Sequence, residues 1–430
     1  MEKKKELYRG KTKAIYATDD ENLVVLENFD DITKFDNPDL TKKLSGKAKQ
    51  ATKTTCNVFS LLKEAKIPVA FEKQLSETEF LAPKCKMIPL EVIARRYAVG
   101  SYLKRFPHLK KEEAQSPHRF HSLKFELFLK TTNGIIKSFK DEELGKVSVD
   151  DPLTKDDDNS WKLMHPKKPE WEEGADLDIE IHQDDILSTG VTVDTIFDIT
   201  LKTFLVLESA WSQQGCRLID FKIEFGINTD GKLMVADVID NDSWRLRTSN
   251  WEELSKENFR QNMKLDDVSS KYDLVAKLSE KFHLPKQAIV FWRGSESDPL
   301  PLGMIKEHES LVHFKDIGIS GHKSPKKAIE KLEKIMAAYP EGGVIIPIVG
   351  MSNGLGPMLA ARTSWPVIAV PATAKEVPED VWSSLRLPSK VPMMTVLSAS
   401  NATLAAFNIL ALKNPAIYAE MQKRIEKLDK

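Results

Sequence analysis

The feature that most constrains the fold of this chain is a change of pattern near residue 286. Before it, predicted strands and helices come in separate runs, which is typical of an α+β fold. One helix is expected to begin near Ser45, and a long amphipathic helix is expected over 192–211, where apolar residues recur at spacings of three and four. Strands are expected at Leu23–Glu27, Val69–Phe71, Met87–Ile93, Arg217–Asn228 and Lys232–Asp240.

Beyond residue 286, short apolar strands alternate with helices. One of these helices is predicted over Pro325–Tyr339, with Ser324 as its N-cap and Pro325 in its first turn. This alternation predicts an α/β domain with a parallel, doubly wound sheet. Because 430 residues exceed what one core supports, we expect two domains, 1–284 and 285–430. The strands are expected at Ala288–Trp292, Leu311–Ile319, Val344–Val349 and Val367–Val370.

The composition excludes several classes of protein. Sixty-three basic residues nearly cancel 64 acidic ones, so the net charge of −1 gives no case for nucleic-acid binding. Three widely spaced cysteines cannot form a disulfide framework. No apolar run approaches the ~20 residues of a membrane helix, and the first ten residues carry no apolar signal core. We therefore expect a cytoplasmic protein that binds neither nucleic acid nor a membrane.

Two carboxylates are expected to meet at a hairpin in the first domain. Asp230-Gly231 between two apolar runs is a strong hairpin signal. A two-residue turn there would place Glu224 directly opposite Asp237, on the same sheet face as Lys222. Like charges opposed on neighbouring strands repel, whereas a magnesium ion held by both would turn the conflict into a binding site. The alternatives are an exposed polar sheet face, or a bulge that breaks the register.

Other segments of the first domain suit a phosphate. Lys11 and Lys13 follow Gly10 near the start of the chain, although the P-loop spacing is absent. Arg95 lies at the end of an apolar strand and Ser101 shortly beyond it, an arrangement that suits an anion pocket. Solvated lysines and surface arginines before a turn are the simpler alternatives. The segment from Asp240 to Arg245 adds polar groups after the hairpin.

In the second domain, three glycine- or serine-rich segments follow strand ends, where ligands of open parallel sheets bind. They are 294–298, 320–324 and 350–356. His322 is the best general acid or base because imidazole titrates near neutrality. No GxSxG elbow and no cysteine occur in these segments, which argues against a nucleophilic hydrolase.

Taken together, these segments resemble a known family. Those of the first half are LYRGKTKAIY, EVIARRYAVGSYLKR, FELFLK, LIDFKIEFG and ADVIDNDSWRL, and those of the second are GSESD, SGHKSP, GMSNGLGP and DVWSSLRLPS. They are similar to the bifunctional purine-biosynthesis family in which an aminoimidazole ribonucleotide (AIR) carboxylase is fused to a succinocarboxamide (SAICAR) synthetase. The resemblance implies an α+β ATP-binding synthetase domain followed by a flavodoxin-like carboxylase domain.

Two reactions are implied. The second half would carboxylate AIR with carbon dioxide, without biotin. The first half would then use ATP and magnesium to join the new carboxylate to L-aspartate. The resemblance further implies a cytoplasmic homo-octamer assembled through the carboxylase half, with small-molecule substrates as its ligands.

The family's site residues carry over by motif. In the synthetase half, they imply ATP binding by Lys11, Lys13, Glu91 and Lys222, metal binding by Glu224 and Asp237, and ribonucleotide binding by Arg95, Ser101, Asp242 and Arg245. In the carboxylase half, they imply ribonucleotide binding by Ser295, Ser297 and Asp298, catalysis by His322, Lys323 and Asp298, and carbon dioxide binding by Ser352, Asn353 and Gly354.

Some segments depart from the family pattern. Met351 stands where relatives carry arginine, and the prolines and glycine of 299–310 interrupt an expected helix. Residues 131–175, rich in charge and proline, are expected to form a solvated insertion. Two alternatives therefore remain beside the bifunctional enzyme: a synthetase whose second half is only an oligomerisation scaffold, and a non-catalytic nucleotide-sensing protein.

Overall fold

The computed structural model describes residues 3–33, 41–111, 116–157, 160–256, 264–295, 298 and 300–428. By their internal contacts, the described residues of 1–283 and 426–430 form one compact unit, and Leu284–Ile425 form a second. None of the helices in these ranges is long and apolar enough to cross a membrane.

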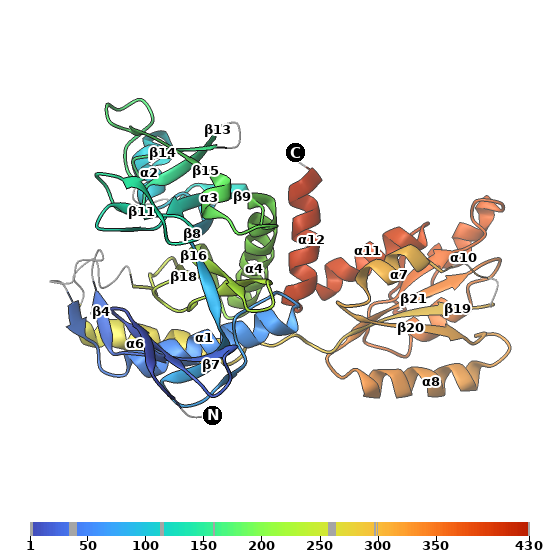
Figure 1. The fold of residues 1–430 in the computed structure, drawn as a ribbon. Helices are drawn as coiled ribbons and strands as arrows, with labels where there is room; N and C mark the ends of the chain where they lie inside the picture. Colours follow the sequence, from blue (N-terminus) through green and yellow to red (C-terminus); the bar gives the residue numbers. More distant parts are fainter. Residues whose placement is uncertain are drawn as a thin grey trace. The chain divides into compact units, whose positions relative to one another are not determined.

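The first unit is built on a large antiparallel sheet with the strand order β15-β14-β13-β9-β8-β16-β17, in which β18 also pairs with β16. Of its long central strands, β8 carries Glu91 and Arg95, and β16 carries Lys222 and Glu224. A long helix, α4, packs against β16 (Figure 1). At this contact Phe204 meets Phe221 edge-on, with ring centroids 5.2 Å apart. The strands are β8 (Cys85–Tyr97), β9 (Arg119–Leu129), β13 (Leu153–Asp157), β14 (Ser160–Met164), β15 (Asp176–His182), β16 (Cys216–Asn228), β17 (Leu233–Ala236) and β18 (Trp244–Thr248).

A second antiparallel sheet in this unit has the order β1-β2-β3-β7-β6. Helix α1 covers it through a cluster of Phe59, Phe71 and Phe80. These strands are β1 (Glu6–Arg9), β2 (Lys13–Ala17), β3 (Leu23–Asn28), β6 (Lys73–Gln74) and β7 (Glu79–Pro83), and smaller sheets comprise β4 (Asp31–Thr33), β5 (Thr41–Lys43), β10 (Thr131–Thr132), β11 (Ile135–Lys137) and β12 (Glu143–Lys146). The helices are α1 (Lys47–Glu64), α2 (Ser101–Arg105), α3 (Gln183–Ile186), α4 (Val193–Gln213) and α6 (Leu265–Ser279).

The second unit is a parallel sheet with the order β20-β19-β21-β22-β23. This is the flavodoxin-like order, in which the second strand of the chain lies outside the first. Side chains alternate between its faces: Val290 and Trp292 pack with α8 and α9, whereas Ile289 and Phe291 pack with α11 and α12. Figure 1 shows α8 and α11 on opposite faces. The elements are β19 (Ala288–Arg293), α7 (Leu302–His308), β20 (His313–Gly318), α8 (Pro325–Ala338), β21 (Gly343–Val349), α9 (Leu355–Ala360), β22 (Ile368–Pro371), α10 (Val381–Leu385), β23 (Met394–Thr395), α11 (Ala399–Leu410) and α12 (Pro415–Leu428).

Both fold classes are thus confirmed, but several local predictions were wrong. Residues 131–175 are not a solvated insertion, because β13 and β14 extend the large sheet and Trp161 and Leu163 are fully buried. Segment 299–310 does contain a helix, α7, which begins just after Pro301. Val69 makes only an isolated bridge to Val235 in place of a strand. By contrast, the predicted start of α8 is confirmed, with Ser324 at the N-cap and Pro325 in the first turn, although the Ser324 side chain makes no capping hydrogen bond.

The predicted hairpin register was also wrong. Glu224 pairs with Ala236, not Asp237, and β17 ends at Ala236. The turn is longer than two residues because Asn228 pairs with Lys232, and the Asn228 side-chain oxygen accepts from the amide of Lys232 at 2.8 Å. Asp237 follows the strand with a φ of 66°, in the left-handed region.

Candidate active sites

Although Glu224 and Asp237 do not oppose each other, both lie in one lysine-lined cluster. Lys13, at the start of β2, is ion-paired with Asp237. Glu224 on β16 accepts from Lys130 at 2.7 Å, just beyond the end of β9. Burial lowers the pKa of Lys13 to about 8, partly opposed by the charge of Glu224. Burial raises the pKa of Glu224, but Lys130, Lys222 and Lys13 together bring it below its usual value.

The other residues predicted to bind ATP lie in the same part of the unit. Lys222 and Glu91, on the paired strands β16 and β8, form an ion pair at 2.5 Å. Lys11 precedes Lys13 in the β1–β2 turn and is exposed. Sequence analysis missed Lys130, although it is the last residue of the FELFLK segment.

The carboxylates here fit a metal that is also held by phosphate oxygens. Among the described residues, no three His, Cys, Asp or Glu side chains gather as a metal site would require. Glu224 and Asp237 each hold a lysine ammonium, so both carboxylates accept a cation in this structure. A magnesium ion takes one or two protein carboxylates plus phosphate and water oxygens, which matches this pair.

A second cluster joins the arginines expected to bind a phosphate. Asp220 on β16 accepts from Arg95 at 2.5 Å and from Arg245 at 2.7 Å. Glu126 on β9 also accepts from Arg95, at 2.6 Å. Arg95 is only 2% exposed, whereas the side chain of Arg245 is 21% exposed. Arg245 is therefore the more accessible of the two to a ligand.

Ser101 and Gly100 complete this region. Ser101 is the first residue of α2. Gly100 has a φ of 59°, and a Cβ atom on it would lie 2.6 Å from Nη2 of Arg245. The backbone thus approaches the guanidinium closely, as only glycine permits. Sequence analysis did not identify Asp220 and Glu126 as the groups that hold the arginines.

Asp242 lies in a third, internally paired cluster. Its carboxylate is 3.2 Å from the ammonium of Lys47 and 3.2 Å from that of Lys256, and it accepts from Tyr272 at 2.5 Å. Burial disfavours its charge, but the two lysines hold its pKa well below the usual range. The pKa of neighbouring Asp240 is raised by burial and by the charge of Asp242. Lys47 is 2% exposed, so this ion pair belongs to the interior.

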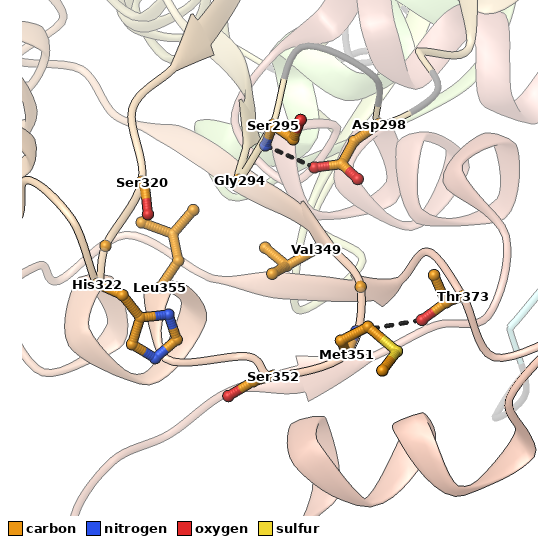
Figure 2. Close-up of a pocket in the computed structure, with 12 residues that line it drawn as sticks. Gly294, Ser295, Asp298, Ser320, His322, Val349, Met351, Ser352, Leu355 and Thr373 are labelled. Carbon is orange, nitrogen blue, oxygen red and sulfur yellow. Dashed lines mark hydrogen bonds between the residues drawn. The ribbon is translucent and has the colours of Figure 1, made fainter.

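The second unit contains a cavity of about 320 Å³ at the carboxyl ends of its strands. Figure 2 shows His322 and the pair Ser295 and Asp298 around it, with Met351 and Ser352 from the loop after β21. All five line the cavity, and four of them, Ser295, Asp298, His322 and Ser352, are predicted site residues. The Asp298 carboxylate accepts from the Ser295 amide at 2.8 Å. Ser297 lies outside the described residues.

His322 owes its position to a glycine. A Cβ atom on Gly354 would lie 2.7 Å from Cε1 and 3.0 Å from Cδ2 of the His322 ring, and closer still to Nε2. The backbone of Gly354 is right-handed, with φ −79° and ψ −21°, so conformation alone does not demand glycine there. The missing side chain makes room for the imidazole.

Three other predicted residues stand apart from the cavity wall. Lys323 is exposed and does not line the cavity. Asn353 is 5% exposed, and its side-chain amide donates to Ser384 and accepts from Gly356. Gly354 is not a lining residue, although the His322 ring, which does line the cavity, lies against it. Ser352 is therefore the member of the predicted carbon dioxide site that lines the cavity.

Comparison with known proteins matches each unit to one family. The family model of SAICAR synthetase matches residues 6–156 and 166–278, and the family model of AIR carboxylase matches residues 289–430. The chain belongs to the SAICAR synthetase and AIR carboxylase families. The bifunctional enzyme is thus supported over the alternative in which the second half is only a scaffold.

Full-length relatives combine both families. The chain is 33% identical to the human bifunctional phosphoribosylaminoimidazole carboxylase/phosphoribosylaminoimidazole succinocarboxamide synthetase, over 98% of this chain and 93% of the human one. It is 34% identical to a probable multifunctional protein ADE2 of Caenorhabditis elegans, over 96% and 92% of the two chains. Among solved structures, the synthase of Ehrlichia chaffeensis covers 65% of this chain and all of its own, with 24% identity and a TM-score of 0.48. PurE of Treponema denticola covers 34% and 92%, with 25% identity and a TM-score of 0.30.

Proposed function

We propose that residues 1–284 carry the ATP-dependent ligase activity and residues 285–430 the biotin-independent carboxylase activity of this bifunctional enzyme. The proposal is supported by the family matches, which end at residue 278 and begin at residue 289. The single observation that carries the assignment of roles is the cavity in which His322, Asp298 and Ser295 meet.

In the carboxylase unit, a ring carbon of AIR attacks carbon dioxide, and a carbon–carbon bond forms. The proton of that ring carbon then leaves to Nε2 or Nδ1 of His322, which restores the aromatic ring. Ser295, Ser297 and Asp298 hold the ribonucleotide, and Lys323 and Asp298 assist His322. Ser352, Asn353 and Gly354 form the loop that encloses carbon dioxide, because a neutral molecule needs a shaped, dry pocket more than it needs charge.

In the ligase unit, a phosphoryl group passes from ATP to the new carboxylate, and ADP leaves. The amine of L-aspartate then attacks this activated carbonyl, phosphate leaves, and the amide forms. Lys11, Lys13, Glu91 and Lys222 position the nucleotide; Arg95, Ser101, Asp242 and Arg245 position the ribonucleotide. Magnesium bound to Glu224 and Asp237 would supply positive charge beside the transferred phosphoryl group.

The assignment of His322 is tested by His322→Ala in an assay with two arms. One arm starts from AIR, bicarbonate, aspartate and MgATP, and the other starts from the carboxylated ribonucleotide. We expect the variant to form succinocarboxamide product only in the second arm. Loss of product in both arms, or in neither, would contradict the assigned role of His322.

The metal assignment is tested by Glu224→Gln and Asp237→Asn in the ligase arm. Each variant should need at least about tenfold more magnesium for half-maximal ligation, because it removes one charged ligand. Glu72→Gln is a matched control, since Glu72 is a partly exposed carboxylate that forms a surface ion pair with Lys63. An unchanged magnesium requirement in both variants would show that the metal binds elsewhere.

We further propose a cytoplasmic homo-octamer assembled through the carboxylase half. Large apolar side chains are exposed in this unit, among them Trp382, Leu385 and Leu397, and burial between subunits would stabilise them. Eight chains of 48.6 kDa give a mass of about 390 kDa, which light scattering would detect. The charged, phosphorylated substrates do not cross membranes, so the enzyme is expected in the compartment that makes them, and cell fractionation would test this.

A further inference from the structure

The short helix α10 belongs to the DVWSSLRLPS segment, for which sequence analysis identified no role. Asp380, at the N-cap of α10, and Ser384, four residues later, are both buried. Residues four apart share one face of a helix. This face is linked to the loop 350–354, part of which lines the cavity, directly through Ser384 and indirectly through Asp380.

The first contact runs through Thr373, which follows β22 and lines the cavity. The amide of Met351 donates to Oγ1 of Thr373 at 3.1 Å, and Thr373 in turn donates to Asp380 at 2.6 Å. A hydroxyl has one hydrogen, so its donation to the carboxylate leaves a lone pair for the amide. Figure 2 shows Thr373 beside Met351 at the cavity.

Met351 needs such a contact. It adopts a φ of 63°, which is uncommon for residues with a side chain, and its side chain is 70% exposed. Packing therefore does not hold it in this conformation. The adjacent Gly350 allows Thr373 to come close, since a Cβ atom there would lie 2.6 Å from Cγ2 of Thr373.

The second contact runs through Asn353. Its amide group donates to Oγ of Ser384 at 2.9 Å, and its oxygen accepts from the amide of Gly356 at 2.8 Å. Asn353 is thus joined both to α10 and to the start of α9. The next residue is Gly354, against which the His322 ring lies.

We propose that Asp380 and Ser384 of α10 are positioning residues that hold the loop 350–354, through Thr373 and Asn353, in the conformation that places His322 for carboxylation. The inference rests on the proposed function of the cavity. It differs from that proposal in predicting that residues outside the cavity set the loop's conformation, whether or not substrate is present.

The test replaces Thr373 and Ser384 in the full-length enzyme. Thr373→Val keeps the shape of the side chain but removes both hydrogen bonds, and Ser384→Ala removes the contact with Asn353. We expect each to lower kcat/KM for carboxylation about tenfold or more, since loss of a buried hydrogen bond displaces the loop it fixes. Thr373→Ser restores the hydroxyl and should recover most of the loss. Ser389→Ala is a control in the same DVWSSLRLPS segment, because Ser389 is exposed whereas Asp380 and Ser384 are buried.

Hydrogen exchange of the Met351 amide gives a readout without substrate. Exchange should be about tenfold faster in Thr373→Val than in the parent and should return toward the parent value in Thr373→Ser. Unchanged exchange and unchanged kcat/KM in Thr373→Val and Ser384→Ala would overturn the inference, as would an equal loss in Thr373→Ser. If Met351 exchanged faster in Thr373→Val as expected, but the parent enzyme did not carboxylate AIR, the proposed function would fail. The conclusion that α10 holds the loop would then still stand.

Discussion

Adding a single methyl group at Gly354 should slow carboxylation while leaving the stability of the fold almost unchanged. In Gly354→Ala the new Cβ would lie 2.7 Å from Cε1 of His322, whereas ordinary van der Waals contact begins near 3.4 Å. The ring must therefore withdraw, by about 1 Å once its nearer nitrogen is included, and a misplacement of that size can cost about 100-fold in rate. Stability should change little, because the backbone of Gly354 suits alanine and the exposed His322 side chain is able to turn toward solvent.

The assay measures kcat for carboxylation, ligation of the carboxylated ribonucleotide, and urea unfolding in each variant. We expect about 100-fold slower carboxylation with unchanged ligation and a free energy of unfolding within about 1 kcal/mol of the parent. Gly303→Ala on α7 is the matched control, because its Cβ would have no neighbour within 4 Å. Carboxylation at the parent rate in Gly354→Ala would refute the claim that His322 acts from its observed position.

Two predictions concern the ligase unit. Gly100→Ala should raise KM for the carboxylated ribonucleotide more than KM for ATP, because its Cβ would displace the guanidinium of Arg245. Gly190→Ala controls for backbone strain, because Gly190 also has a positive φ but its Cβ would have no neighbour within 4 Å. Equal effects of the two variants on KM would count against the role of Arg245 in binding the phosphate. Asp242→Asn should destabilise the protein by about 3 kcal/mol in urea unfolding at pH 7, because it deprives the buried Lys47 of its ion pair. The pKa of Asp242 is lowered by folding, so its contribution is present above the ordinary value of 3.8 and is lost as pH falls below it. The stability difference between parent and variant should therefore shrink in acid, and a difference that grows there would contradict this.

The predictable parts of the fold are those in which apolar periodicity and burial agree. The helix predicted over 192–211 appears as α4 (Val193–Gln213), and Thr192 caps it by accepting from Thr195. The strand predicted at Val344–Val349 appears as β21, buried along its whole length. Both segments were clear because their apolar residues have few alternative arrangements. Sequence analysis did not predict β13 and β14, because charged residues on their outer face obscured the short alternation of apolar and polar residues around Trp161.

The candidate sites divide in the same way. Sequence analysis placed the segments of Ser295, Asp298, His322 and Ser352 at strand ends, which meet at one edge of a parallel sheet. In the structure all four residues line one cavity. It did not predict that the side chain of Asn353 is used internally, since nothing in the sequence shows its distance from Ser384.

Sequence by itself determined the two fold classes, the change between them near residue 286, and the family. These follow from periodicity and from long collinear segments, which are local properties of the chain. Only the tertiary structure decided the pairing of Glu224 with Ala236, the joining of Arg95 and Arg245 by Asp220, and the packing of His322 against Gly354. Each of these depends on distances between segments far apart in the chain or on a turn one residue longer than expected, and side-chain packing fixes such distances only when the whole core has formed.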